Sequence, residues 1–277
     1  MFLSGSDELP KGLFEAACAL NAASPILLIG AFVPKPDYRD MLWYYAGGAE
    51  ALILNRSDAV AGDAGEDDLP ERAIAQFEDR CQRNGIEYRI HQLSGQNLLH
   101  AIRKESRFAD LLMMSNVPSE NQDLETVLHA THNTVDSLHC SECPVLIVPV
   151  DYQEFESVIL AYDGTPDSVF AIKHLACVLP HLATLDTLLV NMHHDGNKEL
   201  PDHEYIHTLA ARHFENLTVF KVGIDPRSHF DSWLSNAPKA LVVMGAFGRN
   251  AVSRMLHPSF ADGILKAHQT PVFIAHR

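Results

Sequence analysis

The chain is poor in cysteine, in tryptophan and in long hydrophobic runs. Its 277 residues include five cysteines and two tryptophans, and cysteines this few and unevenly placed do not predict a disulfide framework. The longest apolar runs, 24–33 and 240–245, have strand length and fall far short of the roughly 20 residues that cross a bilayer. The first dozen residues carry acids and turn formers instead of a basic region before an apolar run. We therefore expect a cytoplasmic protein with no membrane partner.

Positive charge is also scarce. The 21 lysines and arginines face 36 acidic residues, which gives a net charge of −15 with histidine neutral. A polyanion would be repelled by such a chain, so nucleic acid is not an expected partner. Residues 1–150 carry 22 acids and 11 basic residues, whereas residues 151–277 carry 14 and 10. An anionic ligand should therefore prefer the second half.

Two familiar catalytic motifs are missing, since the sequence has no Gly-x-Ser-x-Gly elbow and no Walker loop. The segment HEYIH at 203–207 has the His-Glu-x-x-His spacing. Asp163 near a bound phosphate could assist slow hydrolysis, but no set of base, metal and arginine for phosphoryl transfer is visible. We expect a binding protein and not an enzyme.

What the sequence does contain is an internal repeat. The segment CPVLIVP at 143–149 is matched by TPVFIAH at 270–276, and FADLLMMS at 108–115 is matched by PKALVVMG at 238–245. Each half thus ends with two apolar, strand-like runs separated by a segment of helical periodicity. The length also fits two domains of about 140 residues. We predict domains over 1–150 and 151–277, joined near 149–155.

Strands and helices are expected to alternate in both halves, and the continuous apolar runs indicate parallel strands covered by helices on both faces. The strands are predicted at 1–4, 26–32, 86–93, 109–115, 145–148, 157–162, 187–192, 217–222, 240–244 and 272–275. The helices are predicted at 10–21, 70–84, 96–106, 124–138, 166–179, 203–214, 230–237 and 259–267. The stretch 34–70, which contains Trp43-Tyr44-Tyr45, is interpreted as partly helical or as an excursion from the fold.

The sharpest local motif lies at 243–260, between a predicted strand and a predicted helix. Gly245 and Gly248 let the backbone approach a ligand closely, and Ser259 can cap the following helix. Free amides and the positive end of a helix dipole hold phosphate, with Arg249 or Arg254 available for charge. The motif predicts an anion site.

Together with the strand ending in Asp163-Gly164-Thr165 and with the repeat, this motif resembles the universal stress protein family in its tandem form. The family motif reads Gly, two residues, Gly, nine residues, Gly, then Ser or Thr. Here Gly245, Gly248 and Ser259 match, and Pro258 stands in the place of the third glycine. The resemblance is strong over 157–277 and faint over 1–150, where no glycine follows Met114.

The resemblance implies an α/β fold of two tandem Rossmann-like domains, each a five-stranded parallel sheet of order 3-2-1-4-5 with helices on both faces. It also implies an adenine nucleotide (ATP, ADP or AMP) across the carboxyl ends of strands 1 and 4. Pro258 has no amide hydrogen, so one phosphate contact should be missing or altered. By position, Asp163 would lie beside the ribose or adenosine, backbone near Val190 beside the adenine, and Gly248, Arg249 and Ser259 beside the phosphates. Gly164, Thr165 and Gly245 complete the expected binding residues.

In the family, domains commonly pair through their final strands. The resemblance therefore implies that 145–148 and 272–275 run side by side, so that the chain forms an intramolecular pseudo-dimer, with a further homodimer as an open alternative. In the first half Ser4-Gly5-Ser6 occupies the turn that holds Asp163 in the second. We therefore expect that half to bind no nucleotide.

Three other interpretations stay open. Asp163 alone could serve to cap the helix that follows it. The chain could instead be an interaction module that binds no nucleotide and docks a partner through its acidic first half and Trp43-Tyr44-Tyr45. Metal binding, with zinc as the candidate ion, has two possible sites. These are the pair His203 and His207 with His193, and the pair Cys140 and Cys143 with His129 and His132.

Overall fold

The computed structural model describes most of both halves. The described residues are 1–4, 8–32, 71–93, 98–116, 141–191, 200–220, 239–245 and 270–275. Several predicted features lie outside these ranges, namely the stretch 34–70, the helices at 124–138, 230–237 and 259–267, and the residues His129, His132 and Cys140.

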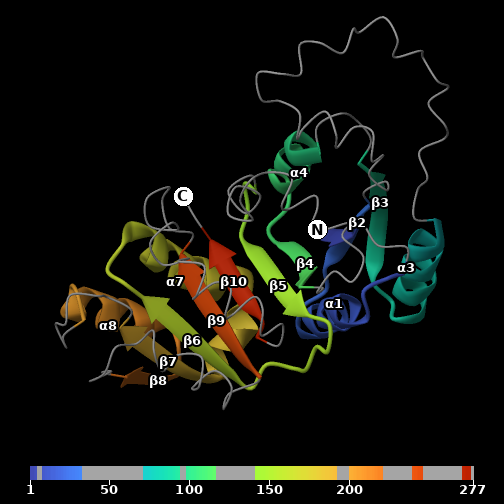
Figure 1. Cartoon of the computed structure of the whole chain (residues 1–277). Helices are drawn as coiled ribbons and strands as arrows, with labels where there is room; N and C mark the ends of the chain where they lie inside the picture. Colours follow the sequence, from blue (N-terminus) through green and yellow to red (C-terminus); the bar gives the residue numbers. More distant parts are fainter. Residues whose placement is uncertain are drawn as a thin grey trace, which may run out of the picture.

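The described strands form one ten-stranded sheet in the order β3-β2-β1-β4-β5-β10-β9-β6-β7-β8 (Figure 1). Within each half every neighbouring pair is parallel. Each half has the order 3-2-1-4-5 when read from its outer strand inward, as expected. The strands are β1 (Phe2–Ser4), β2 (Leu27–Phe32), β3 (Glu87–Gln92), β4 (Leu112–Asn116), β5 (Val145–Pro149), β6 (Ser157–Tyr162), β7 (Asp186–Asn191), β8 (Asn216–Phe220), β9 (Ala240–Gly245) and β10 (Val272–Ala275).

The two halves meet where β5 pairs with β10. This pairing is antiparallel, with Phe273 opposite Leu146 and Val272 opposite Ile147, so the final strands run side by side as the resemblance implied. Every other strand runs parallel to β5 in the first half or parallel to β10 in the second half. The carboxyl ends of the strands in the two halves therefore lie at opposite edges of one continuous sheet.

Helices cover both faces of this sheet. Helices α1, α3, α7 and α8 contribute to one buried cluster, whereas α4 contributes Ile102 to the cluster on the other face. A 3-10 turn at Pro180–Thr184, which the sequence did not predict, follows α7. Among the described helices, none combines the length and apolar content that a bilayer crossing requires. The helices are α1 (Lys11–Ala23), α3 (Glu71–Arg83), α4 (Leu98–Ser106), α7 (Pro166–Val178) and α8 (His203–His213).

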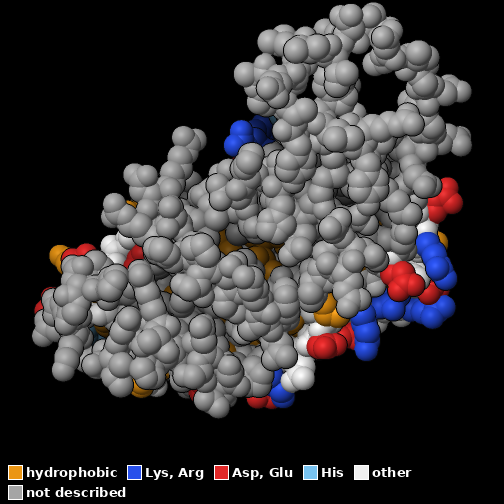
Figure 2. Space-filling view, viewed as in Figure 1, with side chains coloured by type: hydrophobic (Ala, Val, Ile, Leu, Met, Phe, Trp, Pro, Cys, Tyr) orange, Lys and Arg blue, Asp and Glu red, His pale blue; other side chains and the backbone are white. Residues whose placement is uncertain are grey.

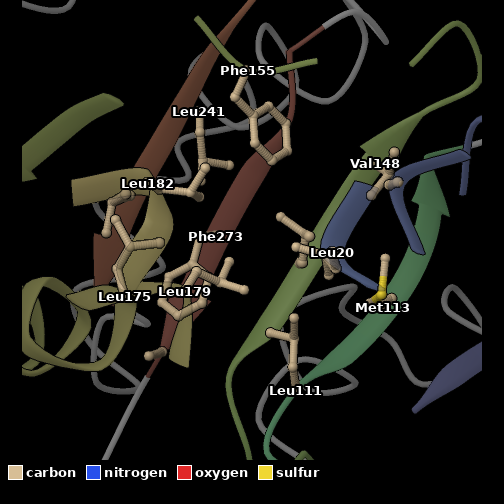
Figure 3. Close-up of a cluster of buried hydrophobic side chains, with 14 of the residues drawn as sticks. Leu20, Leu111, Met113, Val148, Phe155, Leu175, Leu179, Leu182, Leu241 and Phe273 are labelled. Carbon is tan, nitrogen blue, oxygen red and sulfur yellow. The ribbon is translucent and has the colours of Figure 1, made fainter. Parts of the chain in front are cut away.

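The larger buried cluster passes through the junction between the halves without a break. Leu20 and Met113 come from the first half, and Leu175 and Leu241 from the second (Figure 3). Phe273 on the junction strand β10 is fully buried. Burial of each such side chain contributes about 1.5–3 kcal/mol, so the junction is a hydrophobic core and not a surface contact.

Surface charge is mixed where the described residues of α3 lie. Basic and acidic side chains interleave over this helix at the right of Figure 2. Arg83 and Asp79, one turn apart, form an ion pair of 2.8 Å. The acidic excess of the first half is therefore not concentrated on α3.

Candidate functional site

The turn after β6 is held by side-chain hydrogen bonds. Asp163 is 7% exposed, and its Oδ1 accepts from the Thr165 backbone N at 3.0 Å and from Thr165 Oγ1 at 2.7 Å. Thr165 Oγ1 in turn accepts from the backbone N of Ser168 at 3.3 Å and caps α7. The helix cap is thus Thr165, and Asp163 orients that cap while its own carboxylate is fixed in place.

Gly164 sits in this turn with a φ of 82°, a conformation that other residues rarely adopt. A Cβ at this position would lie 2.8 Å from Cβ of Pro201. The Tyr162 hydroxyl donates to the Pro201 carbonyl oxygen at 3.0 Å. Residues 200–202 therefore pack over the turn, and no sequence pattern pointed to Pro201 as the residue that does so.

The hydroxyl of Tyr162 is suited to donate the hydrogen bond to Pro201. Burial raises the pKa of Tyr162, and the negative charges of Asp202 and Asp163 raise it further. Because the unperturbed pKa is already about 10, the hydroxyl keeps its proton at neutral pH and remains a donor. The segment that begins α8 is tied to β6 by this bond.

Gly245 ends β9, the neighbour of β6 in the sheet. A Cβ at this position would lie 2.4 Å from the backbone carbon of Asp167 and 2.5 Å from the backbone N of Ser168. The first turn of α7 therefore occupies the space where a side chain would be. This close packing accounts for the glycine, and a contact with a ligand at Gly245 stays a prediction.

Val190 is the second-last residue of β7 and is buried between two neighbouring strands. It is 1% exposed and is paired with Ala161 on one side and Phe220 on the other. Asn191, which ends β7 opposite Tyr162, is 6% exposed and lies at the same edge as Asp163. The sequence reasoning missed this buried polar residue, although an asparagine ending an apolar strand was a visible signal.

These residues converge at the topological switch point of the second half. The chain continues from β6 to β7 on one side, while β9 flanks β6 on the other, and open α/β sheets bind ligands in the crevice beyond such a point. Asp163, Gly164, Thr165, Asn191 and Gly245 are brought together there. Gly248, Arg249, Pro258 and Ser259 lie outside the described residues.

The corresponding place in the first half is built differently. Leu3 is paired with Met114, and the next residues along the two strands are Ser4 and Ser115. Both serines are buried, at 2% and 7% exposure, and among the described residues neither hydroxyl has a hydrogen-bond partner. No described residue of this half supplies a carboxylate equivalent to Asp163.

The candidate metal ligands are only partly brought together. The rings of His203 and His207 stack on α8 with centroids 5.8 Å apart, while His193 lies outside the described residues. Cys143 is buried, and burial raises the pKa of its thiol. Within the described part of the chain, no three His, Cys, Asp or Glu side chains are grouped as a metal site.

Comparison with known proteins places the fold. No family model matches the sequence, and no curated protein matches it. Among solved structures, the chain is similar to a universal stress protein from Archaeoglobus fulgidus DSM 4304, with a TM-score of 0.61 and 16% sequence identity. The match covers 100% of this chain and 96% of the other. At this identity the likeness establishes the α/β, universal stress protein-like fold.

Proposed function

We propose that this protein is a universal stress protein-like binder of an adenine nucleotide, with the nucleotide site in the second half. The observation that carries the proposal is the buried Asp163, whose carboxylate is fixed by Thr165 at the switch point of the sheet. A buried carboxylate held at such a point is suited to accept hydrogen bonds from a ligand. The fold that the chain shares with a universal stress protein supports the same assignment.

In this proposal Asp163 accepts hydrogen bonds from the ribose hydroxyls. Hydrogen bonds to a charged group contribute about 1.5–3 kcal/mol each. The phosphates extend toward the motif of Gly248, Arg249 and Ser259, where free amides and one guanidinium would neutralise their charge. Binding is the whole of the proposed activity, and no catalytic role is assigned to any residue.

Isothermal titration calorimetry of the purified chain with ATP, ADP and AMP tests the proposal. Asp163→Asn keeps the size of the side chain and removes its charge, so we expect nucleotide affinity to fall by about tenfold or more. The matched control is Asp186→Asn, because Asp186 begins β7 at the opposite edge of the same sheet and is exposed. This control should bind as the unmodified chain does.

Unfolding in urea establishes that each variant is folded before its affinity is compared. Equal affinity in the two variants would show that Asp163 does not contact the ligand. A folded, unmodified chain that takes up no nucleotide at millimolar concentration would overturn the proposal. It would favour the interpretation of the chain as an interaction module.

A further inference from the structure

Two histidines on α8 lie beside one another on its exposed side. His203 and His207 are four residues apart, and side chains at this spacing lie on one face of a helix. Their rings are stacked, with centroids 5.8 Å apart and planes 22° apart. Both residues are exposed, so an ion can reach them from solvent.

The ring separation matches a shared ion. Zinc binds imidazole nitrogen at about 2.0–2.1 Å, and two imidazoles on one tetrahedral ion then have centroids roughly 5 Å apart, given the size of the ring. The observed separation of 5.8 Å is close to that value. To bind one ion, the two stacked rings must turn about their side-chain bonds until one nitrogen of each faces the ion, and exposed side chains are free to do so.

Among the described residues, the two rings contact each other and are not engaged by other side chains. Within the described part of the chain, no hydrogen bond or ion pair involves His203 or His207, and the stacking of the two rings is their described interaction. Asp202, the residue just before α8, has a left-handed conformation with a φ of 48°. Its charge acts on Tyr162, toward the sheet. The pair is thus available to a ligand without the loss of an existing bond.

We propose that His203 and His207 form a two-histidine site for a divalent cation of the zinc and copper class. Imidazole suits these ions, whereas magnesium prefers oxygen ligands in octahedral geometry. Two protein ligands leave the remaining coordination positions to water or to a donor from another molecule. The site lies on α8 and does not depend on the proposed nucleotide site.

Zinc titration by calorimetry, with the thermal midpoint as a second readout, tests this site. Removal of residues that only support metal ligands weakens affinity by roughly 10–100-fold, so His203→Ala and His207→Ala should each cost at least about tenfold. Zinc should also raise the unfolding temperature of the unmodified chain more than that of either variant. His213→Ala is the matched control, because His213 is exposed on the same helix outside the pair.

A gain-of-ligand variant sharpens the test. Ala211 is exposed and lies four residues beyond His207, so Ala211→His adds a third imidazole to the same face and should tighten zinc binding. Magnesium should produce no heat with any variant. The proposal is overturned if the unmodified chain and the His203→Ala, His207→Ala double variant bind zinc equally, or if His213→Ala loses as much affinity as they do.

Discussion

In the second half the first turn of α7 sits directly on Gly245 at the end of β9, whereas in the first half the first turn of α1 sits on the end of β5. A Cβ at Gly12 of α1 would lie 2.3 Å from the Val150 carbonyl oxygen. The repeat aligns Gly245 with Ser115, the second-last residue of β4, so a side chain occupies this position in the first half. Both helices lie over the fourth and fifth strands of their own half, so the halves differ in which of these two strand ends the helix approaches most closely.

This comparison separates the features of the repeat that build the fold from the features that build the candidate site. Strand order and the junction through β5 and β10 are shared. The fixed carboxylate of Asp163 and the cap at Thr165 occur in the second half, while the hydroxyls of Ser4 and Ser115 in the first half have no partner in the part of the chain that the structure describes. A polar group buried without a partner costs stability, so these serines contribute nothing to the fold by hydrogen bonding.

The largest expected effect concerns what the halves share. Phe273→Ala removes a fully buried ring at the junction and should lower the free energy of unfolding by about 3–5 kcal/mol. Because the core is continuous, fluorescence and circular dichroism should report a single urea transition at a lower midpoint. Two separated transitions, with the first half unaffected, would show that the halves are energetically independent.

The next effect compares the two helix starts. Gly245→Ala and Gly12→Ala each force a Cβ into backbone atoms, and such overpacking costs about 1–3 kcal/mol. Both variants should therefore lose stability in urea. Only Gly245→Ala displaces the start of α7 beside Asp163, so it alone should weaken nucleotide binding. Equal loss of binding in both variants would contradict the assignment of the site to the second half.

A smaller difference in stability is expected between loss of the Thr165 hydroxyl, which caps a helix, and loss of the Ser115 hydroxyl. Thr165→Ala removes the cap of α7, which should cost about 0.5–2 kcal/mol. Ser115→Ala removes a buried hydroxyl that has no partner among the described residues, so stability should stay the same or rise. Thermal unfolding of the two variants measures the difference. A loss for Ser115→Ala as large as that for Thr165→Ala would show that the serine hydroxyl is bonded in solution.

The smallest expected effect is a difference in the pH at which each half begins to lose stability. Burial lowers the pKa of His174 and of His181 in the second half, and Lys173 adds to the shift at His174. A bidentate bond to Arg107 lowers the pKa of Glu142 in the first half. In each case the unfolded state binds more protons, so stability falls as the pH is lowered. The loss begins below the ordinary histidine value of 6.5 and, for Glu142, below 4.5.

Urea midpoints at a series of pH values measure this difference. His174→Gln with His181→Gln should remove part of the loss just below pH 6.5, and Glu142→Gln should remove part of the loss below pH 4.5. The Glu142 effect should be small because both partners are solvent-exposed and an exposed ion pair contributes little. A profile that all three substitutions leave unchanged would contradict these assignments.

Much of the fold could be predicted because most strands are compact apolar runs, with β3 as an exception. β6, α7 and α8 differ from their predicted bounds by at most one residue at either end, since Pro166 and the apolar spacing mark the helix starts clearly. The junction pairing was expected from a family resemblance, whereas its register depends on which side chains share the core. Periodicity carries no such information about contacts distant in sequence.

The site was predictable in residue type and not in arrangement. A strand followed by Asp163-Gly164-Thr165 signalled a polar turn, and the structure confirms such a turn. The packing of Pro201 on Gly164, and of α7 on Gly245, depends on how segments distant in sequence fold back. The sequence predicted a ligand contact at Gly245. It carried no signal for the close packing of α7 on the end of β9, which the structure shows at the same glycine.

Photolabelling with an azido derivative of ADP, followed by peptide mapping, tests the central claim most directly, because it reports binding and location together. The account predicts labelled peptides from 151–277 alone, protection by excess unlabelled ADP, and loss of the label in Asp163→Asn. Labelled peptides from 1–150, or no specific label in the folded protein, would contradict it.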